Sequence, residues 1–165
     1  KIAKHLENDP VQVLHETNIL DTGGGLKNAS AFFDGPVVFT SNSDAIWSGP
    51  NPFSYLLQNW QDTCDALLLC APVSQVTGRA APGDFSISQD GMVQRGGDFV
   101  YLGVQIIRLD TVRHIREQRF SLNIVWDELM AKKTLRACLY PGHWCDIGTP
   151  ENIALGEKLL RTRHV

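Results

Sequence analysis

The sequence predicts an α/β fold, because apolar runs typical of strands alternate with segments in which apolar residues recur at helical spacing. Residues 37–40 and 65–71 are almost continuously apolar or β-branched, which indicates strands buried on both faces. Residues 26–33 and 52–63 precede these runs and carry apolar side chains on one helical face. This alternation favours a parallel sheet with right-handed crossovers.

The other segments add helices and an antiparallel flank. Residues 85–87 and 92–94 lie on either side of a turn at Asp90-Gly91, which is typical of a hairpin. Thr149 is a good N-cap, and Pro150 a good first residue, for the last helix. In chain order the remaining expected elements are the end of a helix at 1–6, a short strand at 11–14, loops at 17–25 and 73–82, a strand at 99–107, helices at 110–117 and 124–131, strands at 134–140 and 144–146, and a helix from 151 to about 161.

Length and composition are those of an ordinary globular chain. The 165 residues fit one domain spanning 1–165, with 43% hydrophobic and 20% charged residues. The net charge of -3 comes without a basic stripe, and no window reaches the roughly 18 apolar residues of a membrane span. We therefore expect neither nucleic acid nor a membrane as a partner.

The cysteines do not have the spacing of a zinc or redox motif. Cys64, Cys70, Cys138 and Cys145 contain no Cys-x-x-Cys pair. His143 with Cys145 is disfavoured as a metal site, because no second pair of ligands accompanies it. Free thiols fit a reducing compartment, so we expect a cytoplasmic protein.

Two carboxylates follow predicted strands and are the first candidates for a site. Asp44 comes after the run at 37–40, and Asp146 closes the strand at 144–146. Ligands of open α/β sheets bind at strand ends, and Mg²⁺ prefers a few carboxylates together with phosphate oxygens. The two residues could therefore converge on one cation, or each could simply cap a turn or a helix.

Three consecutive glycines, Gly23 to Gly25, are the other distinctive feature. Residues without a Cβ let the backbone approach a ligand closely, and a helix starting at Gly25 would direct its free N–H groups toward an anion or a base edge. The sequence is neither a Walker loop nor a dinucleotide fingerprint. A purely steric use of glycine before a helix remains the alternative.

Taken together, the motifs resemble those of the sugar-1-phosphate nucleotidyltransferases, over residues 11–160. The similarity is greatest to the bacterial branch of N-acetylmuramate 1-phosphate uridylyltransferases and mannose-1-phosphate guanylyltransferases. The matching segments, in order, are Glu16 with Leu20-Asp21-Thr22-Gly23-Gly24-Gly25-Leu26-Lys27-Asn28-Ala29, Asn42-Ser43-Asp44 with Trp47, Gly83-Asp84-Phe85, Tyr101-Leu102-Gly103-Val104, and Trp144-x-Asp146-Ile147-Gly148-Thr149-Pro150.

The resemblance implies a Rossmann-like, GT-A-like mixed sheet flanked by helices. It also implies transfer of a nucleotidyl group from a nucleoside triphosphate to a sugar 1-phosphate, with release of pyrophosphate. UTP is favoured as the donor and GTP comes next. By position, Asp44 and Asp146 would hold a catalytic Mg²⁺; Glu16, Thr22, Gly23 and Gly24 would contact the nucleotide; and Gly83 and Tyr101 would contact the sugar.

One departure from the family pattern concerns the amino terminus. Family members begin with a strand and a glycine-rich loop carrying Arg and Lys, which grips the triphosphate, and no such segment stands before Lys1. We expect the sequence to omit this part of a longer enzyme, although a genuine fragment is the alternative. A non-catalytic sugar-nucleotide sensor or regulatory subunit, an α/β domain whose acids only cap turns, and a homo-oligomer all remain open.

Overall fold

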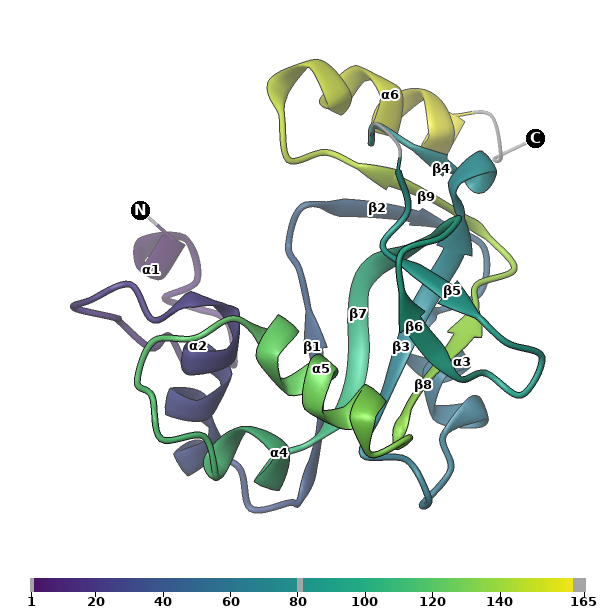
Figure 1. Ribbon diagram of the computed structural model, residues 1–165. Coiled ribbons are helices and arrows are strands. Elements are labelled where there is room, and N and C mark those ends of the chain that lie inside the picture. Colours follow the sequence, from purple (N-terminus) through teal and green to yellow (C-terminus); the bar gives the residue numbers. More distant parts are fainter. Residues whose placement is uncertain (1, 80–81, 162–165) are drawn as a thin grey trace.

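The computed structural model describes residues 2–79 and 82–161 of the chain. It contains both helices and strands, as expected of an α/β protein, and they alternate over only part of the chain (Figure 1). In chain order the elements are α1 (Ile2–His5), α2 (Asp21–Ala29), η1 (Ser30–Phe32), β1 (Val37–Ser41), β2 (Ala45–Ser48), α3 (Pro52–Asn59), β3 (Ala66–Pro72), η2 (Val73–Gln75), β4 (Val76–Thr77), β5 (Phe85–Ile87), β6 (Val93–Arg95), β7 (Phe99–Arg108), α4 (Asp110–Arg113), α5 (Leu122–Ala131), β8 (Leu135–Leu139), β9 (His143–Asp146) and α6 (Pro150–Arg161). In this described part of the chain, no helix has both the length and the apolar character needed to cross a bilayer.

The main sheet is mixed. Within the described residues its strand order is β6-β5-β7-β3-β8, and β1 also pairs with β7. β3 and β8 run parallel, whereas β7 is antiparallel to β1, β3 and β5. This confirms the mixed sheet that the family resemblance implies and corrects the parallel sheet expected from alternation alone. Alternation could not reveal the difference, because β7 comes from the antiparallel flank and enters the centre of the sheet.

At the centre of the main sheet, both faces are buried. Successive side chains of a strand point to opposite faces, so β3 contributes to two core clusters. On β3, Ala66, Leu68 and Cys70 belong to one core cluster, which includes the apolar side chains of α4 and α5. Leu67 and Leu69 belong to a second cluster with Leu56 of α3. Helices therefore cover both faces, and α2, α4 and α5 gather on one side of the molecule (Figure 1).

A smaller sheet carries the strand ends that matter most for the site. Its order is β2-β9-β4, with β2 and β9 antiparallel and β4 and β9 parallel. α6 lies over this sheet (Figure 1). The close approach requires Gly156, because a Cβ there would stand 2.6 Å from Ile46 Cδ1 and 2.9 Å from Ile147 Cγ2.

Two predicted strands are corrected. The run at 37–40 forms β1, but β1 lies at the side of β7 in antiparallel orientation, and Phe39 is 40% exposed. Apolar composition alone cannot separate an inner strand from such a half-buried one. The strand predicted at 11–14 is wrong: these residues form no strand, and Val11 and Val13 are exposed, because alternation without a neighbouring strand provides no pairing.

Several helix boundaries also differ from prediction. α3 ends at Asn59 because Trp60 adopts an extended backbone, and α4 ends at Arg113 because residues 114–120 leave the helix to run beside α2. α2 begins at Asp21, so the expected loop at 17–25 and the helix start at Gly25 are wrong. The hairpin of β5 and β6, the long β7, both closing strands and α6 are confirmed.

Candidate functional site

The structure brings Asp44 and Asp146 together through the pairing of β2 with β9. Ala45 stands opposite Asp146 in the antiparallel register, so Asp44 lies at the adjoining strand end. The Ile147 N–H donates to the Asp44 carbonyl oxygen at 2.9 Å, which continues the pairing. Asp146 Oδ1 accepts the Gly148 N–H at 2.8 Å, and this bond fixes the orientation of its carboxylate.

The two carboxylates converge on one point beside Gly148. A Cβ on Gly148 would stand 3.1 Å from Asp146 Oδ1 and 3.1 Å from Asp44 Oδ2. The two oxygens can therefore be no farther apart than twice that distance. Gly148 is exposed and has no side chain, so the space between the carboxylates is open to a ligand.

These two carboxylates fit a magnesium ion that also binds a substrate phosphate. Mg²⁺ keeps several waters and is usually held by one or two carboxylates together with phosphate oxygens. Within residues 2–79 and 82–161, no group of three or more His, Cys, Asp or Glu side chains could hold a metal ion. The donor set thus suits a hard cation that takes its other ligands from substrate and water.

A cavity of about 830 Å³ lies between α2, β1, β7 and the start of α5. β1 connects it to the carboxylates, because Asn42 lines the cavity and Asp44 follows two residues later. None of the described residues lining it is Lys, Arg or His. The lining residues are Glu16, Ile19, Asp21, Thr22, Gly25, Leu26, Ala29, Phe33, Phe39, Thr40, Ser41, Asn42, Tyr101, Ser121, Leu122, Asn123 and Trp126.

One side of the cavity is aromatic. The rings of Tyr101 and Trp126 pack edge to face, with centroids 4.9 Å apart. The Trp126 Nε1–H donates to Gln105 Oε1 at 3.0 Å, and Gln105 is fully buried. Burial raises the pKa of the Tyr101 hydroxyl above its ordinary value, although a hydrogen bond with Thr40 acts in the opposite direction. Tyr101 therefore presents a neutral phenol.

Another part of the cavity wall carries the acidic residue Glu16. Its Oε2 accepts the Leu20 N–H at 3.2 Å, which holds the carboxylate against the start of α2. A Cβ on Gly25 would stand 2.9 Å from Glu16 Oε1, so the absence of a side chain at Gly25 makes room for Glu16. Thr22 lies at the same helix start and also lines the cavity.

Gly23 and Gly24 do not line the cavity. Both are buried, and both N–H groups donate to the Phe120 carbonyl oxygen, at 2.9 and 3.0 Å. A Cβ on Gly23 would overlap the Phe120 ring, and a Cβ on Gly24 would overlap the Gln118 carbonyl. The N–H groups of Gly23 and Gly24 are therefore already bonded, and the absence of side chains at these two glycines lets residues 118–120 pack against them.

Gly83 lies outside the cavity but is linked to it through the next residue. A Cβ on Gly83 would stand 2.5 Å from the Gly97 carbonyl oxygen, so the turn at this point requires a glycine. Asp84 Oδ2 accepts the Tyr101 N–H at 2.9 Å, and its Oδ1 pairs with Arg79 at 2.6 Å. Asp84 thus fixes the backbone of Tyr101 beside the cavity.

Ser121, Asn123 and Trp126 line the cavity but belong to none of the motifs recognised in the sequence. Ser121 carried a usable signal, since Ser before an apolar helical stretch is typical of an N-cap, and its Oγ does accept the Asn123 N–H. Trp126 carried none, because a tryptophan on the apolar side of a helix is equally suited to the core.

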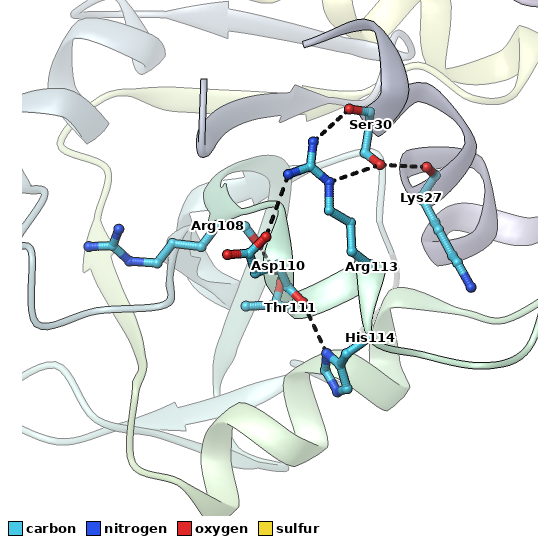
Figure 2. A network of polar contacts seen from close by, with 7 residues as sticks. All are labelled: Lys27, Ser30, Arg108, Asp110, Thr111, Arg113 and His114. Atoms are coloured by element: carbon cyan, nitrogen blue, oxygen red, sulfur yellow. Dashed lines mark hydrogen bonds and ion pairs between the residues drawn. The ribbon is translucent and has the colours of Figure 1, made fainter. Parts of the chain in front are cut away.

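A polar network outside the cavity holds α2 against α4 (Figure 2). The Arg113 guanidinium donates to the Ser30 carbonyl oxygen at 2.8 Å and to Ser30 Oγ at 3.3 Å, and it pairs with Asp110 at 3.5 Å. Lys27 donates to the carbonyl oxygens of Ile115 and Glu117. These bonds anchor the helix whose first turn borders the cavity.

The cysteines supply no nucleophile to this region. All four are free thiols, and Cys64, Cys70 and Cys145 are buried. Burial raises the pKa of Cys138 to about 12 and that of Cys70 well above its ordinary value. Both therefore stay protonated, whereas thiol chemistry requires the thiolate.

Comparison with known proteins identifies a curated relative. N-acetylmuramate alpha-1-phosphate uridylyltransferase of Caulobacter vibrioides is 29% identical over 140 residues, which are 80% of this chain and 58% of the relative. The chain thus spans less than two thirds of that relative's length. No family model matches the chain.

Solved structures share the fold at lower identity. HddC of Yersinia pseudotuberculosis, complexed with GMP-PN, has a TM-score of 0.73 and 20% identity, covering 95% of this chain and 72% of that one. A putative glucose-1-phosphate thymidylyltransferase of Bacillus anthracis has a TM-score of 0.73 and 13% identity, covering 97% and 71%. The predicted resemblance is confirmed: in sequence and in fold, the chain is a homologue of the sugar-1-phosphate nucleotidyltransferases.

Proposed function

We propose that the protein transfers a nucleotidyl group from a nucleoside triphosphate to a sugar 1-phosphate, with Mg²⁺ held by Asp44 and Asp146. The observation that carries the proposal is the convergence of these two carboxylates on the open space at Gly148. A magnesium ion bound there would neutralise charge on the phosphates. The homologous uridylyltransferase supports the reaction class.

The charges of the residues lining the cavity indicate which parts of the substrates would bind there. It contains the carboxylates of Glu16 and Asp21, and none of the described lining residues is a cation. Neutral polar groups, the nucleobase and the sugar ring, suit such a cavity, whereas phosphates belong near the cation at Asp44 and Asp146. Glu16, held at the start of α2, would face the base, and Tyr101, whose backbone Asp84 fixes, would face the sugar.

The reaction itself needs no protein nucleophile. An oxygen of the sugar phosphate attacks the α-phosphorus of the triphosphate, the bond from that phosphorus to the bridging oxygen breaks, and pyrophosphate leaves with that oxygen. The protein's work is to align the two substrates and to place countercharge near the α-phosphate. Asp44 and Asp146 contribute by fixing the position of the cation.

For the nucleotide donor, we propose UTP first and GTP second. The Glu16 carboxylate is an acceptor that can take the ring N–H of uracil or the N–H groups of guanine, so it alone does not choose. The name of the Caulobacter relative favours uridylyl transfer. The free thiols fit a reducing compartment, and we propose a cytoplasmic location.

The direct test measures pyrophosphate release by the protein in the full length that its gene encodes. Mg²⁺, UTP or GTP, and a panel of sugar 1-phosphates are supplied to the wild type and to Asp44→Asn and Asp146→Asn. These replacements keep side-chain size but remove the charge, and each should lower kcat by at least about a hundredfold. Asp34→Asn, at an exposed turn, is the matched control. Unchanged turnover in the two variants would reject the metal assignment.

A sugar-nucleotide sensor is the second candidate. It is favoured by the lack of a cationic side chain among the described residues lining the cavity, because turnover requires positively charged groups that bind the triphosphate. In that case a UDP-sugar would raise the melting temperature, while no pyrophosphate would be released with any substrate pair.

A further inference from the structure

Two segments about a hundred residues apart in sequence are bonded to each other beside the cavity. They are residues 20–24, at the start of α2, and residues 118–122, which lead into α5. The Phe120 N–H donates to the Leu20 carbonyl oxygen at 3.1 Å, and the Phe120 carbonyl oxygen accepts from both Gly23 and Gly24. The Leu122 N–H donates to Thr22 Oγ1 at 3.0 Å. We call this set of bonds the clasp.

Thr22 thereby completes the amino-terminal cap of α5 from another element. The first N–H groups of a helix have no partner within the helix and need an outside acceptor. Ser121 Oγ accepts the Asn123 N–H at 3.2 Å, as an N-cap does, and Thr22 Oγ1 accepts the N–H of Leu122, the first residue of the helix. The position of the first turn of α5 thus depends on a hydroxyl of α2.

The hydrogen-bonding groups of Thr22 are already in use. Its N–H donates to Asp21 Oδ1 at 2.6 Å, and its hydroxyl donates to the same oxygen at 3.3 Å while accepting from Leu122. A hydroxyl has one proton to donate. A nucleobase that bonded to this proton would have to displace the Asp21 carboxylate.

The first turns of α5 form the aromatic and amide side of the cavity. Ser121, Leu122, Asn123 and Trp126 all line it. Trp126 packs against Tyr101, the residue proposed to face the sugar, with ring centroids 4.9 Å apart. A shift in the start of α5 would therefore move the side of the cavity that is proposed to face the sugar.

The clasp has little room to shift. Side chains at Gly23 or Gly24 would overlap Phe120 or Gln118, so the two segments are in direct backbone contact. Phe120 is 3% exposed, and its ring belongs to the same core cluster as Leu122 and Val125. Because the two segments are in close contact, a change in the position of Thr22 would also change the position of the start of α5.

We propose that Thr22 is a positioning residue: its hydroxyl sets the start of α5, and through it the sugar side of the cavity, and does not read the nucleobase. The assignment of the two sides of the cavity to base and sugar rests on the function proposed above. The hydrogen-bond role of Thr22 does not, and it can be measured without turnover.

The test compares Thr22→Val, which keeps side-chain shape and removes the hydroxyl, with Thr22→Ser, which restores it. Thr22 is exposed, so both replacements are compatible with folding, and Thr22→Ala serves as a smaller second variant. Thr17→Val, an exposed threonine in the preceding loop, is the matched control. Hydrogen exchange of peptides covering residues 119–124 and the KM of each substrate are recorded for every variant.

Loss of the hydroxyl should speed exchange in residues 119–124 about fivefold and raise KM for the sugar 1-phosphate by a similar factor, as expected for one hydrogen bond. KM for the nucleoside triphosphate should stay within about twofold, and Thr22→Ser should restore both values. A rise in KM for the triphosphate alone, with unchanged exchange, would overturn the proposal. If the wild type shows no turnover, the transferase proposal fails, and the exchange data still decide whether the clasp exists.

Discussion

At the residue scale, the proposed cation site depends on Gly148. Both carboxylate oxygens lie 3.1 Å from the point where its Cβ would stand, which is closer than ordinary van der Waals contact. Any larger residue would place a methyl group between Asp44 and Asp146. The glycine therefore keeps free the space between the carboxylates, where we propose that the cation binds.

Gly148→Ala should weaken Mg²⁺ binding about tenfold, because the carboxylates must move apart to accommodate the methyl group. The fold should persist, since Gly148 is exposed. The Mg²⁺ concentration giving half-maximal pyrophosphate release measures the effect. Gly35→Ala is the control, because the nearest atom to its Cβ would be 3.8 Å away. Equal Mg²⁺ dependence in both variants would place the cation elsewhere.

His114 is predicted to make stability depend on pH. Its Nδ1 lies 3.0 Å from the Asp110 carbonyl oxygen and its Nε2 lies 2.9 Å from Glu128 Oε2 (Figure 2 shows the Asp110 bond). These bonds raise the pKa of His114, with nearby Lys132 opposing. A raised pKa in the folded state means that the stabilisation is fully present below the unfolded pKa of about 6.5 and is lost as the pH rises through the folded value.

Urea unfolding of the wild type and His114→Gln checks this prediction. The difference in unfolding free energy should be larger at about pH 5.5 than at about pH 8.5. His15→Gln, at an exposed position in the loop before α2, should show no such change. A difference that grows with pH would contradict the sign.

Single residues were the easiest part of the site to predict from sequence. Asp44 and Asp146 stood out as carboxylates at strand ends, but their proximity depends on the register of β2 with β9, and β2 was not predicted. The glycine triplet was recognised as unusual and a steric use was left open, but nothing in the sequence shows that Phe120 is the residue that packs against it. Both the proximity of the two carboxylates and the packing of the glycines depend on contacts between residues far apart in the sequence.

At the element scale, α6 supports the small sheet that carries the two carboxylates. It approaches β2 and β9 through Gly156, which is buried against Ile46 and Ile147. In an exposed helix, replacing Gly by Ala stabilises by about 1 kcal/mol. At Gly156 the added methyl group has no room, so the sign should reverse.

Gly156→Ala should therefore destabilise the protein by about 1–3 kcal/mol, as overpacking does. Thermal unfolding measures the change. Ala154→Gly, at an exposed position of the same helix, should cost only about 0.5–1 kcal/mol. A higher melting temperature for Gly156→Ala would show that α6 does not pack closely on the sheet.

Elements with a local signal were predicted well. β3 was recognised because apolar residues fill both of its faces, and the hairpin was recognised from Asp90-Gly91, where Gly91 has a φ of +79°. β1 was placed wrongly because its neighbours are set by distant β7. The extent of α4 was overestimated because the clasp draws residues 118–120 away from it.

At the scale of the whole molecule, the cavity and the pair of carboxylates are separate, so in the proposed function the neutral substrate groups and the phosphates would bind at different places. The cavity lies against the main sheet, and the carboxylates lie at the edge of the small sheet, with β1 leading from one to the other. Sequence motifs predicted this reaction class through family resemblance. They could not predict the cavity, because its walls come from four separate parts of the chain.

Ligand binding should stabilise the whole protein if the cavity and the carboxylates act together. A nucleoside triphosphate at about a hundred times its Kd should add about 2.7 kcal/mol of stability, measured as a thermal shift. The shift should be larger with Mg²⁺ than without it in the wild type and equal in Asp44→Asn. A Mg²⁺-dependent shift that survives in Asp44→Asn would separate the cation from this residue.

The most direct test of the central claim is the anomalous scattering of Mn²⁺, which shares the oxygen preference of Mg²⁺, in crystals grown with a nucleoside triphosphate. The account predicts one strong peak bonded to carboxylate oxygens of both Asp44 and Asp146. A peak held by other residues, with these two carboxylates unbound, would contradict it.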